Sequence, residues 1–186
     1  VILVKCKNIT IMNSELTNTD VGIELWQSDN CLISNNNISS NNGDGISLWY
    51  SNNNSISNNI ISNNYDGIYL YGSKNNSISN NNISNNGDGI YLYGSNNNSI
   101  SNNDISSNRF GIYLWYSKNN SISNNDISSN NWYGIYLRHS NKNIIYLNNF
   151  INNTYNAYSD SSTNIWNSTE KITYTYNGKQ HTNYLG

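Results

Sequence analysis

The chain has 186 residues and a formal net charge of -2, from nine Lys and Arg against eleven Asp and Glu. Charged residues make up 11% of the chain and Pro is absent, which is unlike the charged, Pro-rich composition of disordered proteins. A balance this close to neutral, with no column of basic residues, excludes the electrostatic footprint of a nucleic-acid-binding protein.

A motif of sequence Gly-Ile-x-Leu recurs along the chain at intervals of 22 or 23 residues. Two further apolar positions repeat in register with it, five residues apart, which is typical of a solenoid in which stacked units share one core. The motif glycines are Gly22, Gly45, Gly67, Gly89, Gly111 and Gly134. The two apolar columns are Ile11, Ile33, Ile56, Ile78, Ile100, Ile122 and Ile145, and Leu16, Ile38, Ile61, Ile83, Ile105, Ile127 and Phe150.

Within each unit, apolar and polar residues alternate, as in 90–93 and 99–101. This period of two predicts short strands, and the Asn, Ser and Gly between them predict turns. One unit has too few core residues to fold alone, so units must stack in parallel. We therefore expect an all-β fold, a right-handed parallel β-helix of about seven 22-residue coils.

The repeat stops near residue 154, which predicts β-helix repeats over 1–154 and a small C-terminal β cap over 155–186. In the cap, Ile172, Tyr174 and Tyr176 alternate with polar residues and precede Asn177-Gly178, a strong hairpin signal. The chain begins with Val1 rather than Met, so we expect a fragment or a processed chain. The tail also leads us to expect truncation at the C-terminus.

Two polar columns have structural roles in our interpretation. Stacked Asn amides can hydrogen-bond along the axis, and Asn tolerates the left-handed conformation that coil corners need. The Asn column is Asn13, Asn35, Asn58, Asn80, Asn102 and Asn124. The Ser column is Ser28, Ser51, Ser73, Ser95, Ser117 and Ser140, continued in the first coil by Cys6.

Aromatic residues occupy the outward positions of the Gly-Ile-x-Leu strand. Stacking and β-propensity explain part of this pattern, but Tyr and Trp with apolar faces and polar tips also suit a sugar or a neighbouring subunit. The candidate glycan- or partner-binding residues are Trp26, Trp49, Tyr69, Tyr71, Tyr91, Tyr93, Tyr113, Trp115 and Tyr136.

Asp44, Asp66 and Asp88 immediately precede three motif glycines, and stacked carboxylates are what a carbohydrate-active β-helix enzyme needs. No Lys or Arg shares their column, and Asp before Gly is also ordinary turn chemistry. The same three carboxylates are the candidates for a weak cation site. The sequence therefore favours a protein that is not an enzyme and has no cofactor.

Four sequons at one repeat position offer a column of glycosylation sites on an exported chain. The acceptor candidates are Asn53, Asn75, Asn97 and Asn119.

Units such as "GIYLYGSNNNSISNNDISSN", and the tail "NSTEKITYTYNGKQHTNYLG", resemble the NosD-like right-handed β-helix proteins, a family common among archaeal surface proteins. The resemblance covers nearly the whole chain and implies an extracellular or cell-surface location. The family name comes from copper-delivery accessory proteins. Copper needs convergent soft or imidazole ligands, whereas the donors here are scattered among Cys6, Met12, Cys31, His139 and His181.

Together these patterns predict a non-catalytic structural or adhesive solenoid of an exported protein. A glycan-binding module or a carbohydrate-active enzyme is the alternative, copper handling is a minor one, and Ser-Ile-Ser arrays leave ice binding open. Val1 would begin inside a coil with its strand edge unpaired. Either a preceding segment covers that edge or another chain stacks on it end to end.

Overall fold

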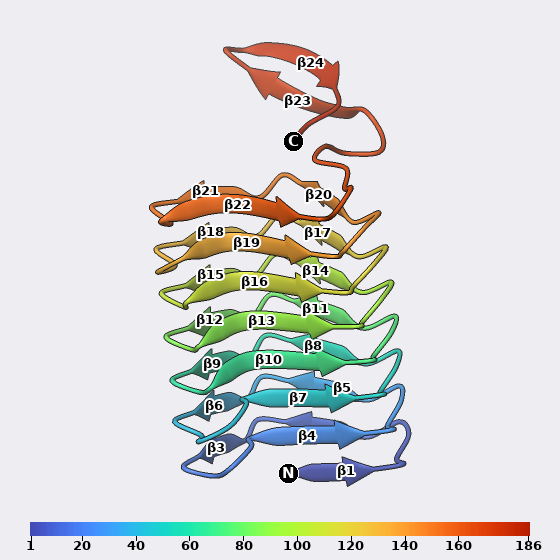
Figure 1. Ribbon diagram of the computed structural model, residues 1–186, viewed down its shortest axis with the longest axis vertical. Helices are drawn as coiled ribbons and strands as arrows, with labels where there is room; N and C mark the ends of the chain where they lie inside the picture. The colour runs from blue at the N-terminus through green and yellow to red at the C-terminus, as the bar shows by residue number, and fades with distance from the viewer.

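The computed structural model describes residues 1–186 and is a right-handed parallel β-helix, as the repeat predicts. Each coil contributes one strand to each of three parallel sheets, and an antiparallel hairpin follows the last coil (Figure 1). Strand partners are one coil apart, for example Ile68 with Ile90 and Ile78 with Ile100. The 22-residue period is thus the length of one coil.

The first sheet carries the Gly-Ile-x-Leu motif and holds the longest strands. It consists of β1 (Ile2–Val4), β4 (Ile23–Trp26), β7 (Ile46–Trp49), β10 (Asp66–Tyr71), β13 (Asp88–Tyr93), β16 (Phe110–Trp115), β19 (Tyr133–Arg138) and β22 (Tyr155–Asp160). The second sheet consists of β2 (Thr10–Met12), β5 (Leu32–Ser34), β8 (Ser55–Ser57), β11 (Ser77–Ser79), β14 (Ser99–Ser101), β17 (Ser121–Ser123) and β20 (Ile144–Tyr146). The third sheet consists of β3 (Glu15–Thr17), β6 (Asn37–Ser39), β9 (Ile60–Ser62), β12 (Asn82–Ser84), β15 (Asp104–Ser106), β18 (Asp126–Ser128) and β21 (Asn149–Ile151).

The core is a single cluster of 25 buried side chains inside the coils. Each middle coil supplies four of them, such as Ile90, Leu92, Ile100 and Ile105, all fully buried. Because every layer repeats the same four residues, each Ile or Leu packs on its equivalent above and below. The core is therefore continuous along the axis although each strand contributes only one or two residues to it.

Each coil corner contains two consecutive residues with different structural roles. The first residue adopts the left-handed conformation, as in Asn53, Asn58 and Asn63 with φ of 56°, 56° and 59°. The second residue is buried and hydrogen-bonds along the axis, as in Asn54 and Asn59. Asn suits both roles, because it tolerates a positive φ and carries a donor and an acceptor. This pairing explains the high Asn content.

The predicted Asn ladder is wrong by one residue. Asn80 and its equivalents are the left-handed corner residues, so that half of the prediction holds. The stacked amides belong to the following residue: Asn81 Nδ2 donates to Asn103 Oδ1 at 3.0 Å, and Asn59 Nδ2 donates to Asn81 Oδ1 at 3.0 Å. Leu147 keeps the corner conformation with φ of 53°, so the corner persists where the Asn is lost.

Four ladders run along the axis rather than two. The Ser ladder is present as predicted, with each backbone N–H donating to the next Ser Oγ, as from Ser73 to Ser95 at 3.0 Å. The Ser ladder is Ser28, Ser51, Ser73, Ser95, Ser117, Ser140 and Ser162. The Asn ladders are Asn36, Asn59, Asn81, Asn103, Asn125 and Asn148; Asn41, Asn64, Asn86, Asn108, Asn130 and Asn153; and Asn54, Asn76, Asn98, Asn120, Asn143 and Asn164.

Parallel pairing continues past residue 154. Strand β22 pairs with β19 in the first sheet, and Ile165 bridges to Ile144, because these residues keep the coil register after the repeat sequence has ended. The hairpin of β23 (Ile172–Tyr176) and β24 (Lys179–Asn183) turns at Asn177-Gly178 as predicted. The structure contains no helix long and apolar enough to cross a membrane. End-to-end stacking at the β1 edge stays a prediction.

Candidate functional site

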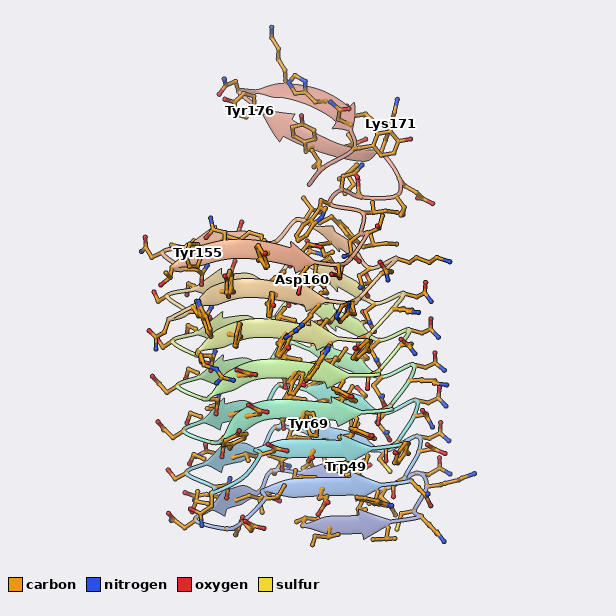
Figure 2. All side chains as sticks on the ribbon, viewed as in Figure 1. Trp49, Tyr69, Tyr155, Asp160, Lys171 and Tyr176 are labelled. Atoms are coloured by element: carbon orange, nitrogen blue, oxygen red, sulfur yellow. The ribbon has the colours of Figure 1, made fainter.

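The outward side of the first sheet is covered by stacked aromatic rings, and we call this surface the aromatic face (Figure 2). One column runs from Trp26 through Trp49, Tyr71 and Tyr93 to Trp115, with centroids 4.8 to 5.3 Å apart. A second column contains Tyr69, Tyr91, Tyr113, Tyr136 and Tyr158, with centroids 4.7 to 5.6 Å apart. The nine sequence-predicted aromatic residues therefore lie on one surface.

Stacking decides which part of each ring solvent can reach. Tyr71 and Tyr93 are stacked at an interplanar angle of 7°, and Tyr91 and Tyr113 at 5°, so their ring faces cover one another. These side chains are half-buried. The middle of the aromatic face thus presents ring edges and phenol hydroxyls, which favour hydrogen bonds over stacking on a flat ligand.

Further aromatic residues belong to this surface, although the motif columns did not reveal them as candidates. Tyr50, Tyr116 and His139 lie at the corner next to the sheet. Tyr50 packs edge-on against Tyr71 of the sheet at 5.3 Å, and Tyr116 stacks on His139 at 5.1 Å. Phe110 and Tyr133 add a third column on the other side. The signal for them was present, since each recurs at a fixed offset from a motif glycine.

The three predicted carboxylates lie in this third column, one per coil. Asp66 and Asp88 are buried, with 6% and 2% exposed area, and Asp44 is half-buried. The backbone N–H of Asp88 donates to Asp66 Oδ1 at 3.0 Å. Next in the column come Phe110 and Tyr133, so the carboxylates end beneath aromatic rings.

The expectation that no Arg accompanies the Asp column is wrong. Arg109 donates from Nη2 and Nε to Asp88 Oδ1 at 2.9 and 3.1 Å, and its guanidinium carbon lies 5.0 Å from the Phe110 ring centroid. Comparing equivalent repeat positions does not reveal this pair, because Arg109 lies one position before Phe110 and its side chain contacts Asp88 in the preceding coil. No comparable cation pairs with Asp44 or Asp66.

Burial of these carboxyl groups favours their protonated forms. Burial raises the pKa of Asp66 to about 7, and the neighbouring Asp88 charge adds to the rise. Burial also raises the pKa of Asp44 to about 6 and that of Asp88, where Arg109 opposes the rise. The phenol pKa values of Tyr69 and Tyr91 are raised as well, mainly by burial. Burial therefore shifts the titration of this column toward neutral pH, most of all at Asp66, which has no cationic partner.

Other predicted sites lie away from the aromatic face. The sequon residues Asn53, Asn75, Asn97 and Asn119 are exposed at one corner column, and their glycosylation stays a prediction. Cys6 and Met12 lie in the first coil and Cys31 is buried in the second, whereas His139 and His181 lie in the seventh coil and the hairpin. No three His, Cys, Asp or Glu side chains are grouped to hold a metal ion. The weak cation site at the Asp column stays a prediction.

The aromatic face is open surface rather than a pocket. The one cavity is lined by Tyr146, Ser168, Thr169, Glu170 and Ile172 and lies between the second sheet and the tail.

A family model described as periplasmic copper-binding protein (NosD) matches residues 1–186. The chain belongs to the NosD family. The match covers every coil and the tail, so the resemblance seen in the repeat units is confirmed. No curated protein sequence matches the NosD-family chain.

Solved structures confirm the fold. A double mutant of the periplasmic alginate epimerase AlgG has a TM-score of 0.69 and 25% identity, over 77% of this chain and 34% of AlgG. The mannuronan C-5 epimerase AlgE4 A-module of Azotobacter vinelandii gives 0.60 and 19%, over 86% and 58%. A DFA-IIIase mutant of Arthrobacter chlorophenolicus A6, in complex with DFA-III, gives 0.59 and 18%, over 80% and 40%. The chain thus spans between 34% and 58% of these structures.

Proposed function

We propose that this NosD-family chain is a non-catalytic adhesive solenoid of an exported protein, and that its aromatic face binds an extended glycan. The observation that carries the proposal is the continuity of that face. Rings from Trp26 to Tyr158 follow one another at about stacking distance across successive coils, and no pocket interrupts them. A long, open, edge-presenting surface suits a polymer better than a small molecule.

The comparisons support the same proposal. The family description names a periplasmic copper-binding protein, and the structural neighbour AlgG is a periplasmic alginate epimerase, so this architecture occurs in periplasmic proteins and in one that acts on a polysaccharide. A preorganised row of stacked rings loses little conformational entropy on binding. We infer that the NosD-family coil supplies the scaffold and that this chain's Tyr and Trp columns supply the affinity.

Glycan binding is tested with immobilised polysaccharides and the triple variant Trp49→Ser, Tyr71→Ser and Tyr93→Ser. Loss of these rings removes contacts worth about 0.5–1.5 kcal/mol per pair, so we expect polysaccharide binding to fall at least tenfold. Tyr146→Ser, which changes a half-buried Tyr of the second sheet, is the matched control and should bind like the wild type. If the triple variant bound the immobilised polysaccharide as well as the Tyr146→Ser control, the proposal would be contradicted.

A carbohydrate-active enzyme is the second candidate, favoured by the different environments of Asp66 and Asp88. Asp88 has a guanidinium partner and Asp66 has none, a pattern in which one carboxyl donates a proton while its neighbour stays charged. Their strands pair directly, and adjacent strands lie about 4.8 Å apart, near the separation of about 5 Å between the carboxyls of retaining glycosidases.

Asp66→Asn and Asp88→Asn test this second candidate. If polysaccharide is cleaved or epimerised, both variants should lower the rate by about a hundredfold or more, with the protein still folded by circular dichroism. A wild-type chain that binds polysaccharide without changing its length or sugar composition would leave the binding function and remove the enzymatic one.

A further inference from the structure

A row of five side chains crosses the aromatic face at β16 and ends in a guanidinium group on each side. Arg109 lies 5.0 Å from the Phe110 centroid, Phe110 lies 5.2 Å from Tyr113, and Tyr113 lies 6.4 Å from Trp115. The Arg138 guanidinium carbon is 5.5 Å from the Trp115 centroid. We call these five residues the arginine-flanked strip. The other coils have no such strip, because they carry Asp, Gly, Tyr, Trp or Thr at the position of Arg109 and Val, Trp, Tyr or Asp at the position of Arg138.

Both guanidinium groups keep free hydrogen-bonding capacity. Arg109 uses Nε and Nη2 on a single oxygen, Asp88 Oδ1, while 56% of its side chain is exposed. Arg138 is 44% exposed, and its Nε lies 3.5 Å from Asp160 Oδ2, which is too long for a strong ion pair. An Arg has five N–H donors in a planar fork that matches a carboxylate. Each Arg can therefore accept an anionic group from solvent.

Nearby acids reduce this attraction without removing it. Arg109 and Asp88 neutralise each other, and the half-buried Asp160 lies beside Arg138. The attraction for an anion therefore comes from the exposed N–H donors of the two guanidinium groups rather than from a net positive charge.

Phe110 is buried, with 5% exposed area, so the half-buried Tyr113 and Trp115 are the rings that offer their edges to a sugar between the two Arg residues. Cations stacked on rings are also held in place before a ligand arrives.

We propose that the arginine-flanked strip selects carboxylated glycans, with Arg109 and Arg138 each pairing with a carboxylate of the bound chain. The proposal rests on the proposed glycan-binding function and names the chemical class of the glycan. The exposed guanidinium donors single out this occupant, because a carboxylate can accept two parallel N–H donors from one guanidinium, whereas a neutral chain could be bound by the aromatic columns alone.

The test compares polygalacturonate with the same polymer after complete methyl esterification, which removes the charge and keeps the sugar. Wild-type protein should bind polygalacturonate about tenfold more tightly than the ester, and Arg138→Gln should remove most of that preference. Arg109→Gln should act likewise, although it also leaves Asp88 unpaired, so Arg138→Gln is the decisive variant. Lys118→Gln makes the same charge change at an exposed residue outside the strip and is the control.

Two results would overturn the proposal, and they are distinguishable. Equal affinity for both polymers, unchanged in Arg138→Gln, would refute carboxylate selection and leave the glycan-binding function in place. No binding to either polymer or to other immobilised glycans would refute both. A preference lost equally in Lys118→Gln and Arg138→Gln would show general charge attraction and would also contradict the strip.

Discussion

Replacing Asp66 by Asn should change how the stability of the protein depends on pH. Asp66 is buried, its pKa is raised from 3.8 to about 7, and its Oδ1 accepts the Asp88 N–H at 3.0 Å. An Asn can keep that acceptor while losing the ability to ionise. The variant therefore separates the hydrogen bond from the charge.

The sign of the effect follows from the higher pKa in the folded state. The folded chain holds the Asp66 proton more tightly than the unfolded chain, so the stabilisation is fully present below pH 3.8 and is lost as pH rises through about 7. A rise from 3.8 to about 7 corresponds to at most about 4 kcal/mol of unfolding free energy. Asp44, with a pKa raised to about 6, titrates in the same column and adds to the loss.

Urea denaturation followed by circular dichroism between pH 4 and pH 9 measures this difference. The wild type should lose stability across that range, whereas Asp66→Asn should lose less and become the more stable of the two above pH 7. Asp104→Asn, at an exposed carboxylate of the third sheet, should follow the wild type. If wild type and Asp66→Asn lost stability in parallel, the buried carboxyl would not be the group responsible.

Three other substitutions test the fold, each by the shift in thermal or urea midpoint. Asn81→Ala deletes a buried amide that makes hydrogen bonds to two neighbouring coils, so we expect a loss of about 3 kcal/mol. Asn80→Ala, at an exposed corner with a φ of 57°, should cost about 1 kcal/mol, because Ala must adopt the left-handed conformation. Gly89→Ala places a Cβ 2.5 Å from a backbone oxygen of the next coil and should prevent the two coils from stacking. Gly94→Ala is the control, since its Cβ meets no atom within 4 Å; it should lower the free energy of unfolding by about 1–2 kcal/mol, because Ala must adopt a positive φ. Ile83→Ala, fully buried, should cost about 2–5 kcal/mol.

The period and the core were predictable because both depend on residue type at fixed spacing. Ile83 and Ile105 are the same residue 22 positions apart, and all members of their column are apolar and buried or half-buried. The pairing of coils follows directly from that register. Fold class and core could therefore be derived from the sequence alone.

The ladder and the carboxylate partner could not be derived in the same way. Asn80 and Asn81 carry identical side chains, so only the backbone conformation decides which one turns the corner and which one points inward. Arg109 pairs with Asp88 through a side chain that crosses from one coil to another and from one column to the next. A column alignment compares equivalent positions and cannot show such a diagonal contact.

The repeat itself limits what the aromatic face can recognise. Similar rings on successive coils, such as Tyr91 above Tyr69, give a ligand nearly the same contacts after a shift of one coil, so the columns contribute affinity but do not fix the position of a polymer. Position can be fixed only where the repeat is broken. On this face it is broken by Glu24 and Ser47 in the early coils and by Arg109 and Arg138 near β16, of which only the Arg residues can bind a carboxylate. Specificity should therefore be concentrated in the coils of β16 and β19, while the coils of β7, β10 and β13 lengthen the surface on which the polymer rests.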